Sequence, residues 1–213
     1  MLKEKIFHED GEAVNALVRH LADRLDAFTA DGAGCLFAVG GGRTPVKVLP
    51  VLSEYPCRWR RVTVTLTDDR CVPVDDPDSI EAMVRRFLLQ NAAAEAKFVG
   101  LRGGKNPSAL APDLVYLGFG EDGHAASIFP GGPECHEAGR GLVSAEAPVH
   151  PKDRIGFTLP SLIAAREIVI LVSGAEKRAV YDRCLNEPGA SHLPLAIVLR
   201  HPDARTTVFI DET

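Results

Sequence analysis

Apolar residues recur along the chain with two different spacings, and each spacing predicts a type of secondary structure. Helical spacing, with an apolar residue at every third or fourth position, is clearest in residues 11–30. Thr44 and Pro45 suit the start of a second helix, because proline is favoured in a first turn, and Pro50 keeps that helix short or kinked. Further helices are expected over residues 80–90, 161–166 and 176–185.

Short apolar runs rich in β-branched residues predict the strands. These runs cover residues 34–39, 61–67, 113–117, 167–172, 193–199 and 206–210. The last run is expected at an edge of the sheet, and residues 91–112 predict a poor strand followed by a loop. Helices and strands alternate, which is typical of a mostly parallel sheet with helices on both faces. We therefore predict an α/β protein with a single domain over residues 1–213, in a three-layer α/β/α arrangement with a Rossmann-like sheet.

Composition fits this prediction and argues against several classes of protein. Hydrophobic residues make up 46% of the 213 residues, enough for a sizeable core, and the net charge is −5. No long basic run is present, so nucleic acid is not an expected partner. No apolar run reaches the ~18 residues of a membrane span, and residues 1–10 lack the apolar core of a signal peptide. We expect a cytoplasmic protein that does not bind membranes.

Three of the predicted strands end in clusters of polar residues and glycine, and parallel strands bind ligands at their carboxyl ends. In residues 40–45, three glycines expose backbone N–H groups, Thr44 adds a hydroxyl and Arg43 adds charge, just before a predicted helix. This combination favours an anion such as phosphate, and an ordinary glycine turn is the alternative. The Gly-Lys-Ser/Thr ending of a Walker loop is absent.

The other two clusters carry groups that can move protons. Residues 67–70 end a strand with two aspartates and an arginine, and a surface turn is the alternative. Residues 118–124 match the G-x-G-x-x-G pattern of dinucleotide-binding proteins, but Glu121 and Asp122 would repel a pyrophosphate. His124 beside these acids is a candidate for acid–base catalysis. A zinc site is the weaker interpretation, since no His/Cys ligand spacing accompanies it.

Together these segments resemble the 6-phosphogluconolactonase family, in the family's order and over most of the chain. Residues 41–45 are similar to its S-G-G-S-T-P loop, residues 68–73 to its D-E-R-x-V-P segment, and residues 117–131 to its L-G-x-G-x-D-G-H-T-A-S-L-F-P-G motif. Residues 154–160 and 173–177 resemble its R-I-T-x-T-L-P and S-G-x-x-K segments. The chain departs from the family pattern at four positions, Gly40, Arg43, Asp69 and Ile80.

The resemblance implies hydrolysis of a sugar phosphate lactone, 6-phospho-D-glucono-1,5-lactone, to 6-phospho-D-gluconate in the oxidative pentose phosphate pathway, without a cofactor or a metal. His124 would activate water as a general base, with Asp122 or Glu121 orienting its ring. Arg70 or N–H groups of the glycine turn would stabilise the oxyanion, and Asp68 would hold the water or sugar hydroxyls. The residues implied in phosphate binding are Gly41, Gly42, Arg43, Thr44 and Lys177, with Arg102 as a further contact.

Two other functions fit the same fold. The related glucosamine-6-phosphate deaminase/isomerase family shares the glycine loop and a G-x-G-x-D-G-H turn. Its second motif resembles D-E-Y and an Asn-Glu-Pro-Gly segment follows its histidine, where this chain has the different residues 68–70 and 127–130. A non-catalytic sugar-phosphate-binding module is the third interpretation, and the acids beside His124 argue against it. We expect a monomer or a weak homo-oligomer.

Overall fold

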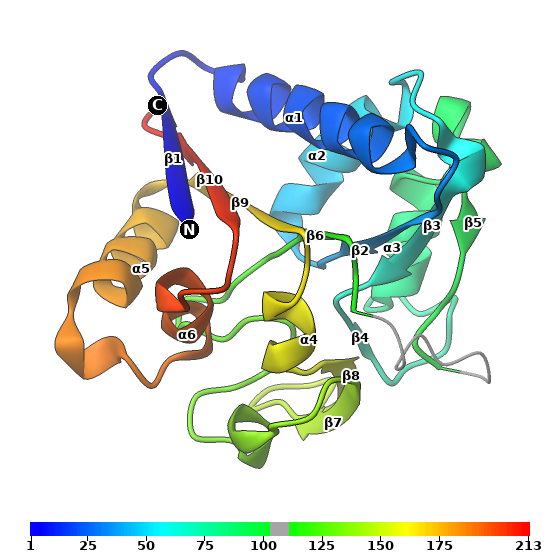
Figure 1. Ribbon diagram of the computed structural model, residues 1–213. Helices are drawn as coiled ribbons and strands as arrows, with labels where there is room; N and C mark the ends of the chain where they lie inside the picture. The colour runs from blue at the N-terminus through cyan, green and yellow to red at the C-terminus, as the bar shows by residue number, and fades with distance from the viewer. Residues whose placement is uncertain (103–110) are drawn as a thin grey trace.

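The computed structural model describes residues 1–102 and 111–213 and shows a central sheet between two layers of helices (Figure 1). The strands of this sheet are β1 (Leu2–Phe7), β2 (Cys35–Val39), β3 (Val62–Leu66), β5 (Lys97–Phe98), β6 (Leu114–Tyr116), β9 (Glu167–Ser173) and β10 (Thr206–Asp211). They lie in the order β1-β10-β9-β6-β2-β3-β5, and every neighbouring pair is parallel. The predicted α/β/α fold class with a mostly parallel, Rossmann-like sheet is therefore confirmed.

The helices follow the prediction closely where their apolar spacing is regular. They are α1 (Glu12–Thr29), α2 (Arg43–Ser53), α3 (Ile80–Phe87), α4 (Leu159–Ile163), α5 (Ala175–Asn186) and α6 (Pro194–Arg200). In Figure 1, α1 and α2 run above the sheet, while α4, α5 and α6 lie below it. The apolar stripe of α1 is buried as its spacing predicts, and Ser79 caps α3 by accepting a hydrogen bond from the backbone N–H of Ala82 at 3.1 Å. Short 3₁₀ turns lie at Trp59–Arg61, Asn91–Glu95, Pro133–His136 and Pro188–Ala190.

A small antiparallel sheet accompanies the central one, and the sequence analysis did not predict it. It consists of β4 (Asp68–Arg70), β8 (Asp153–Phe157) and β7 (Leu142–Glu146), in that order. Only Thr67 separates β4 from β3, so the chain passes directly from the end of the central sheet into this second one. In Figure 1, β7 and β8 lie below α4. The polar cluster at residues 67–70 therefore belongs to a sheet edge and not to a surface turn.

Two strand predictions are wrong, and each has a physical reason. Residues 193–199 form α6 and not a strand, because a continuous apolar run fits both structures and Pro194 starts a helix here. The strand at residues 206–210 is not at an edge, since β10 lies between β1 and β9. The edge is β1, which was missed because four of its six residues are exposed and most of these are charged.

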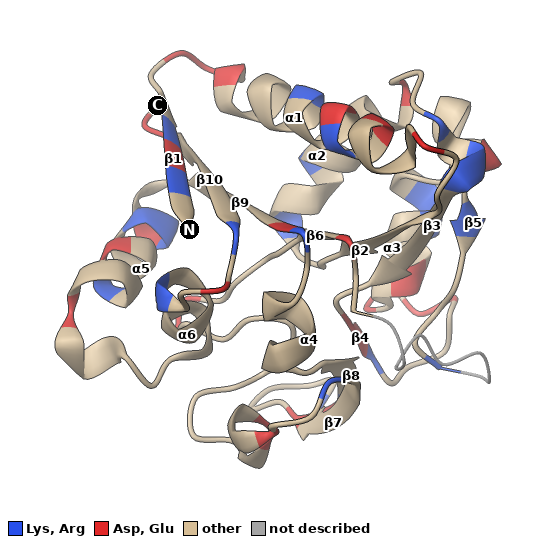
Figure 2. Ribbon diagram, in the orientation of Figure 1, with Lys and Arg blue, Asp and Glu red and all other residues tan. Residues whose placement is uncertain are grey.

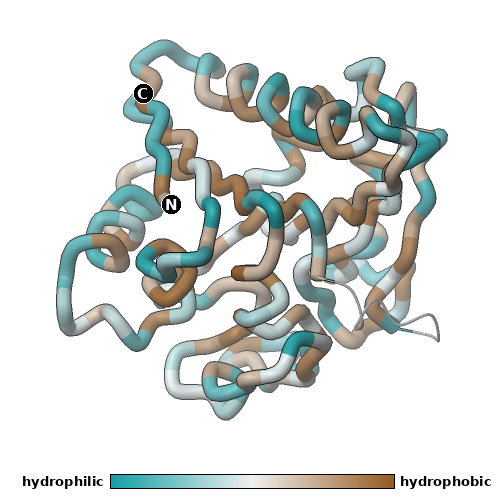
Figure 3. Tube along the Cα trace, viewed as in Figure 1, coloured by the Kyte–Doolittle hydropathy of each residue, from teal (hydrophilic) through white to brown (hydrophobic). Residues whose placement is uncertain are grey.

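One hydrophobic core joins both helical layers to the sheet. The hydropathy colouring of Figure 3 shows brown, apolar residues concentrated along the central strands, and Figure 2 shows charged residues distributed over the outer helices. The predicted poor strand in residues 91–112 is the two-residue β5, whereas the predicted loop at Gly103, Gly104 and Pro107 lies outside the described residues. None of the helices described is long and apolar enough to cross a membrane.

Candidate active site

The carboxyl ends of β2, β6 and β9 and the first turns of α2 and α5 surround a cavity of about 790 Å³. Both helices start after a glycine with positive φ, Gly42 at 109° and Gly174 at 88°, a conformation that other residues rarely adopt. No side chain of the described residues caps either helix, so first-turn N–H groups are available to a ligand. The cavity wall contains five of the predicted phosphate-binding residues, Gly41, Gly42, Arg43, Thr44 and Lys177.

Lys177 is a half-buried cation of this cavity. Its ammonium group lies 4.4 Å from the centroid of the Phe119 ring and donates a hydrogen bond to the Phe119 carbonyl oxygen. Burial lowers the pKa of Lys177, and the charge of Arg43 lowers it further, against the opposing effect of Glu121. An anion bound between Lys177 and Arg43 would offset both unfavourable effects. The cavity is therefore suited to a phosphate group.

His124 lies in the turn that follows β6, and Asp122 fixes the orientation of its ring. One oxygen of Asp122, Oδ1, lies 2.6 Å from Nδ1 of His124 and also accepts the backbone N–H of His124 at 3.0 Å. The ring packs over Gly120 and against Phe129, with 4.8 Å between the ring centroids. The carboxylate favours a proton on Nδ1, which leaves Nε2 as the nitrogen that can accept one. The predicted acid–base pair is thus Asp122 and His124.

The backbone of Phe119 and Gly120 connects the cavity to this imidazole. Phe119 lines the cavity, and Gly120 lies directly beneath the His124 ring. Glu121 comes next in the turn, and its backbone carbonyl oxygen accepts a hydrogen bond from the guanidinium of Arg183 at 3.2 Å. Of the two acids that were expected to orient His124, Asp122 makes the contact and Glu121 does not.

Asp68 is buried and reaches the His124 turn through a serine. One carboxylate oxygen accepts a hydrogen bond from the hydroxyl of Thr67 at 2.7 Å, and the other accepts one from the hydroxyl of Ser127. Ser127 has a φ of 57°, in the left-handed region that serine seldom adopts. The contact with Asp68 therefore holds a strained part of the turn. Ser127 lies in the motif of residues 117–131, and the sequence alone predicts no role for it.

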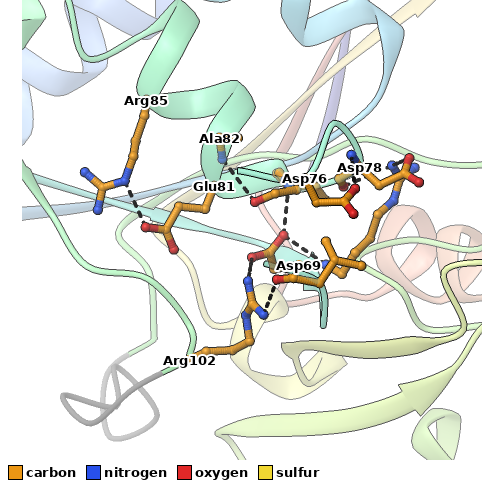
Figure 4. A network of polar contacts seen from close by, with 11 residues as sticks. Asp69, Asp76, Asp78, Glu81, Ala82, Arg85 and Arg102 are labelled. Carbon is orange, nitrogen blue, oxygen red and sulfur yellow. Dashed lines mark hydrogen bonds and ion pairs between the residues drawn. The ribbon is translucent and has the colours of Figure 1, made fainter. Parts of the chain in front are cut away.

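Arg70 and Arg102 bind acids in a separate network beside the small sheet. The guanidinium of Arg70 contacts Oδ1 of Asp78 at 2.6 Å and its carbonyl oxygen at 3.1 Å. Arg102 contacts Oδ2 of Asp69 at 3.4 Å (Figure 4). Asp69 is almost fully buried and also accepts the backbone N–H of Ile80 at 2.9 Å, where α3 begins. Arg102 is absent from the cavity wall, in contrast to its expected phosphate contact.

Burial dominates the electrostatics of Asp69. It raises the pKa of this carboxyl, although hydrogen bonds from Ile80 and Arg70 and the charge of Arg102 act in the opposite direction. These donors occupy both oxygens of Asp69, so the side chain fixes the start of α3 to β4. Over residues 1–102 and 111–213, no group of three or more His, Cys, Asp and Glu side chains is arranged to hold a metal ion.

A parallel sheet between helical layers, with Arg43 and Lys177 in a cavity and an oriented imidazole at its strand ends, is the arrangement of a sugar-phosphate enzyme. The chain belongs to the family of glucosamine-6-phosphate isomerases and 6-phosphogluconolactonases, whose family model matches residues 8–209. It is 32% identical to a 6-phosphogluconolactonase of Neisseria meningitidis, over 97% of this chain and 99% of that protein. It is 36% identical to a 6-phosphogluconolactonase of Pseudomonas putida, over 91% of this chain and 88% of that protein.

The similarity extends to a solved structure. A crystal structure of a 6-phosphogluconolactonase from Shewanella baltica superposes with a TM-score of 0.89 at 28% identity. The comparison covers 99% of this chain and 98% of that chain. The whole fold, including the small sheet, is therefore that of this family.

Proposed function

We propose that the protein hydrolyses 6-phospho-D-glucono-1,5-lactone to 6-phospho-D-gluconate, a step of the oxidative pentose phosphate pathway. The observation that carries this proposal is the Asp122–His124 pair beside the cavity where Arg43 and Lys177 lie at the first turns of α2 and α5. The named lactonases, which match this chain along nearly their full length, support it further. A lactone is an activated ester, so attack by a water molecule with a general base requires neither a covalent nucleophile nor a cofactor.

The cavity would bind the phosphate of the substrate. Backbone N–H groups of Gly41 and Gly42, the hydroxyl of Thr44 and the cations Arg43 and Lys177 would be its contacts. Binding energy from this remote group would position the lactone carbonyl for attack at the His124 turn.

In the reaction, the oxygen of water forms a bond to C1 of the lactone while Nε2 of His124 takes its proton. The bond between C1 and the ring oxygen then breaks, and His124 returns the proton to that oxygen. The new carboxylic acid releases its proton to solvent. Asp122 would stabilise the imidazolium that exists between these steps, because it accepts the hydrogen bond from Nδ1.

Asp68 would hold the attacking water or a sugar hydroxyl, since each carboxylate oxygen has one lone pair beyond the contacts with Thr67 and Ser127. Arg70 and Arg102 would act through the carboxylates that they hold, Asp78 and Asp69. Glu121 would contribute negative charge near Lys177. These assignments refine the roles that the sequence predicts for the same residues.

The test is hydrolysis of freshly made lactone. 6-Phosphogluconolactone is generated in situ at slightly acidic pH, where spontaneous hydrolysis is slow, and product formation is measured with and without the protein. We expect His124→Gln to lower kcat by about 10²- to 10⁴-fold with little change in KM, the range of one acid–base group. Absence of lactone hydrolysis by the wild-type protein would overturn the proposed function. Normal turnover by the variant would overturn only the role of His124.

We further infer that the reaction takes place in the cytoplasm and that the protein is a monomer or a weak homo-oligomer. Light scattering at micromolar concentration would measure the mass in solution. A stable oligomer at that concentration would contradict the second inference.

A further inference from the structure

One face of the small sheet carries an arginine, Arg154, that has no role in the proposed reaction. Arg154 lies directly opposite Arg70 in the β4–β8 ladder, and Gly156 lies opposite Asp68. Opposite residues, and residues two apart on one strand, point to the same side of a sheet. Asp68, Arg70 and Arg154 therefore share a face.

This face is turned toward the turn that carries His124. A Cβ added at Gly156 would lie 2.6 Å from the carbonyl oxygen of Ala126 and 2.9 Å from the Cβ of Asp68. Glycine at position 156 thus lets the His124 turn pack directly onto the sheet. Since Arg154 is two residues away on the same face, its side chain leaves β8 beside this contact.

Arg154 forms no direct ion pair with a carboxylate in the described part of the chain, although Asp68, Asp69 and Asp78 are near enough to favour its charge. Only 8% of the residue is exposed, and its Nε donates to the carbonyl oxygen of Pro151 at 2.8 Å. Its terminal nitrogens make no hydrogen bond to any residue in 1–102 or 111–213. They are not fully buried either, because no nitrogen of Arg154 is among the buried side-chain atoms of the described residues that lack a hydrogen-bond partner.

The environment of Arg154 is unfavourable for a cation. Burial lowers the pKa of Arg154, and the charge of Arg70 across the ladder lowers it further, while the charges of Asp68, Asp78 and Asp69 act in the opposite direction. Arg70 differs, because Asp78 binds its guanidinium at 2.6 Å. A buried guanidinium without a directly bonded carboxylate gains stability when an anion contacts its free N–H groups.

We propose that Arg154, and not Arg70, is the guanidinium that contacts the lactone carbonyl during attack and the carboxylate of the product. This inference rests on the proposed function, because it assumes that the lactone lies at the His124 turn. The phosphate is bound at the α2 and α5 cavity, so a second anion site beside Asp68 suits the other end of the same molecule. A guanidinium can bind both oxygens of a carboxylate with two parallel hydrogen bonds.

Two ligands that differ at one end test the proposal by calorimetry. 6-Phosphogluconate has a phosphate and a carboxylate, whereas glucitol 6-phosphate has the phosphate and a hydroxymethyl group in place of the carboxylate. We expect Arg154→Gln to weaken binding of 6-phosphogluconate by about 10- to 100-fold, the range of a charged hydrogen bond, and to change binding of glucitol 6-phosphate by less than about twofold. Arg43→Gln is the matched control and should weaken both ligands alike.

Kinetics supply the second readout. Arg154→Gln should lower kcat by about 10²- to 10³-fold, as for loss of one oxyanion donor, and Arg154→Lys should recover part of it because it keeps the charge. Thermal unfolding tests whether both variants fold. If Arg154→Gln does not fold, the same binding and kinetic measurements are made on Arg154→Lys. An equal loss of affinity for both ligands, or no loss of affinity for either, would overturn the proposal. If the wild-type protein binds both ligands but hydrolyses no lactone, the proposed function fails and the carboxylate comparison still decides the role of Arg154.

Discussion

Substitution of Gly120 by alanine should disable the reaction without unfolding the protein. The ring of His124 occupies the space that a side chain at position 120 would need. An added Cβ would overlap Cε1 and Nδ1 of His124 and would lie 2.7 Å from Oδ1 of Asp122. The backbone of Gly120 is not in the left-handed region, so alanine adds no backbone strain of its own. The whole effect therefore falls on the position of the imidazole.

The size of the effect follows from the displacement. Ordinary contact begins at 3.4 Å, so the ring must move by about 1 Å or more to admit the methyl group. A misplacement of about 1 Å costs on the order of 10²-fold in rate, or about 2.7 kcal/mol in the activation barrier. The side chain of His124 is one-third exposed and can turn toward solvent. The free energy of unfolding should consequently change by less than about 1 kcal/mol.

The assay compares kcat and KM for fresh lactone with a urea-unfolding curve for the same variant. Gly139→Ala is the matched control, because a Cβ there meets no atom within 4 Å and Gly139 also lacks a positive φ. We expect kcat to fall for Gly120→Ala alone, with KM and the unfolding midpoint close to those of the wild type. A kcat within threefold of the wild-type value would refute the argument that this ring position is required.

Two further substitutions test the contacts around the site and the sheet. Ser127→Ala removes a hydrogen bond to the buried carboxylate of Asp68 and should lower the free energy of unfolding, measured in urea, by about 1.5–3 kcal/mol. The control Ser144→Ala changes an exposed serine and should have little effect on this free energy. Equal effects of the two substitutions would contradict the stabilising role of the Ser127–Asp68 contact. For Glu167, burial opposes ionisation, but hydrogen bonds, the strongest from His20, outweigh it and lower the pKa. The lowered pKa stabilises the fold above the unfolded-state pKa of about 4.3, and this is lost as the pH falls through the folded-state pKa. The stability difference between wild type and Glu167→Gln should therefore shrink from pH 7 to pH 3, and a constant difference would exclude the effect.

Local pattern predicts the inner strands of the central sheet because these strands are buried on both faces. β2, β3 and β9 are continuous apolar or β-branched runs, and such runs are visible without knowledge of their partners. β4 contains the polar residues Asp68 and Asp69, and it becomes a strand only by pairing with β8 across more than 80 positions, whereas β8 also pairs with the nearby β7. No window of sequence contains the β4–β8 pairing, so the membership of β4 in the small sheet could not be predicted from local pattern.

The same distinction applies to the site. The glycine loop at residues 40–45 and the Asp122–His124 pair are local features, and their geometry agrees with what their sequence predicts. The partner of Arg70 depends on how residues 71–79 fold back onto β4, and the position of Arg154 depends on the β4–β8 register. A charged residue in a sequence motif predicts a role at the site, but tertiary structure determines which group that residue contacts.

The path of the chain explains why glycine is needed at two further positions. β6 and β3 are not neighbours, since β2 lies between them, and yet the turn after β6 reaches Asp68 beyond the end of β3. The turn must therefore cross the end of β2, where a Cβ at Gly40 would lie 2.9 Å from the backbone nitrogen of Gly118. It then meets β8 at Gly156, where a Cβ would lie 2.6 Å from the Ala126 carbonyl oxygen. The departure at Gly40 from the family's serine thus lies where the glycine loop of residues 40–45 crosses the turn that carries His124, and the backbones of these two segments are in direct contact there.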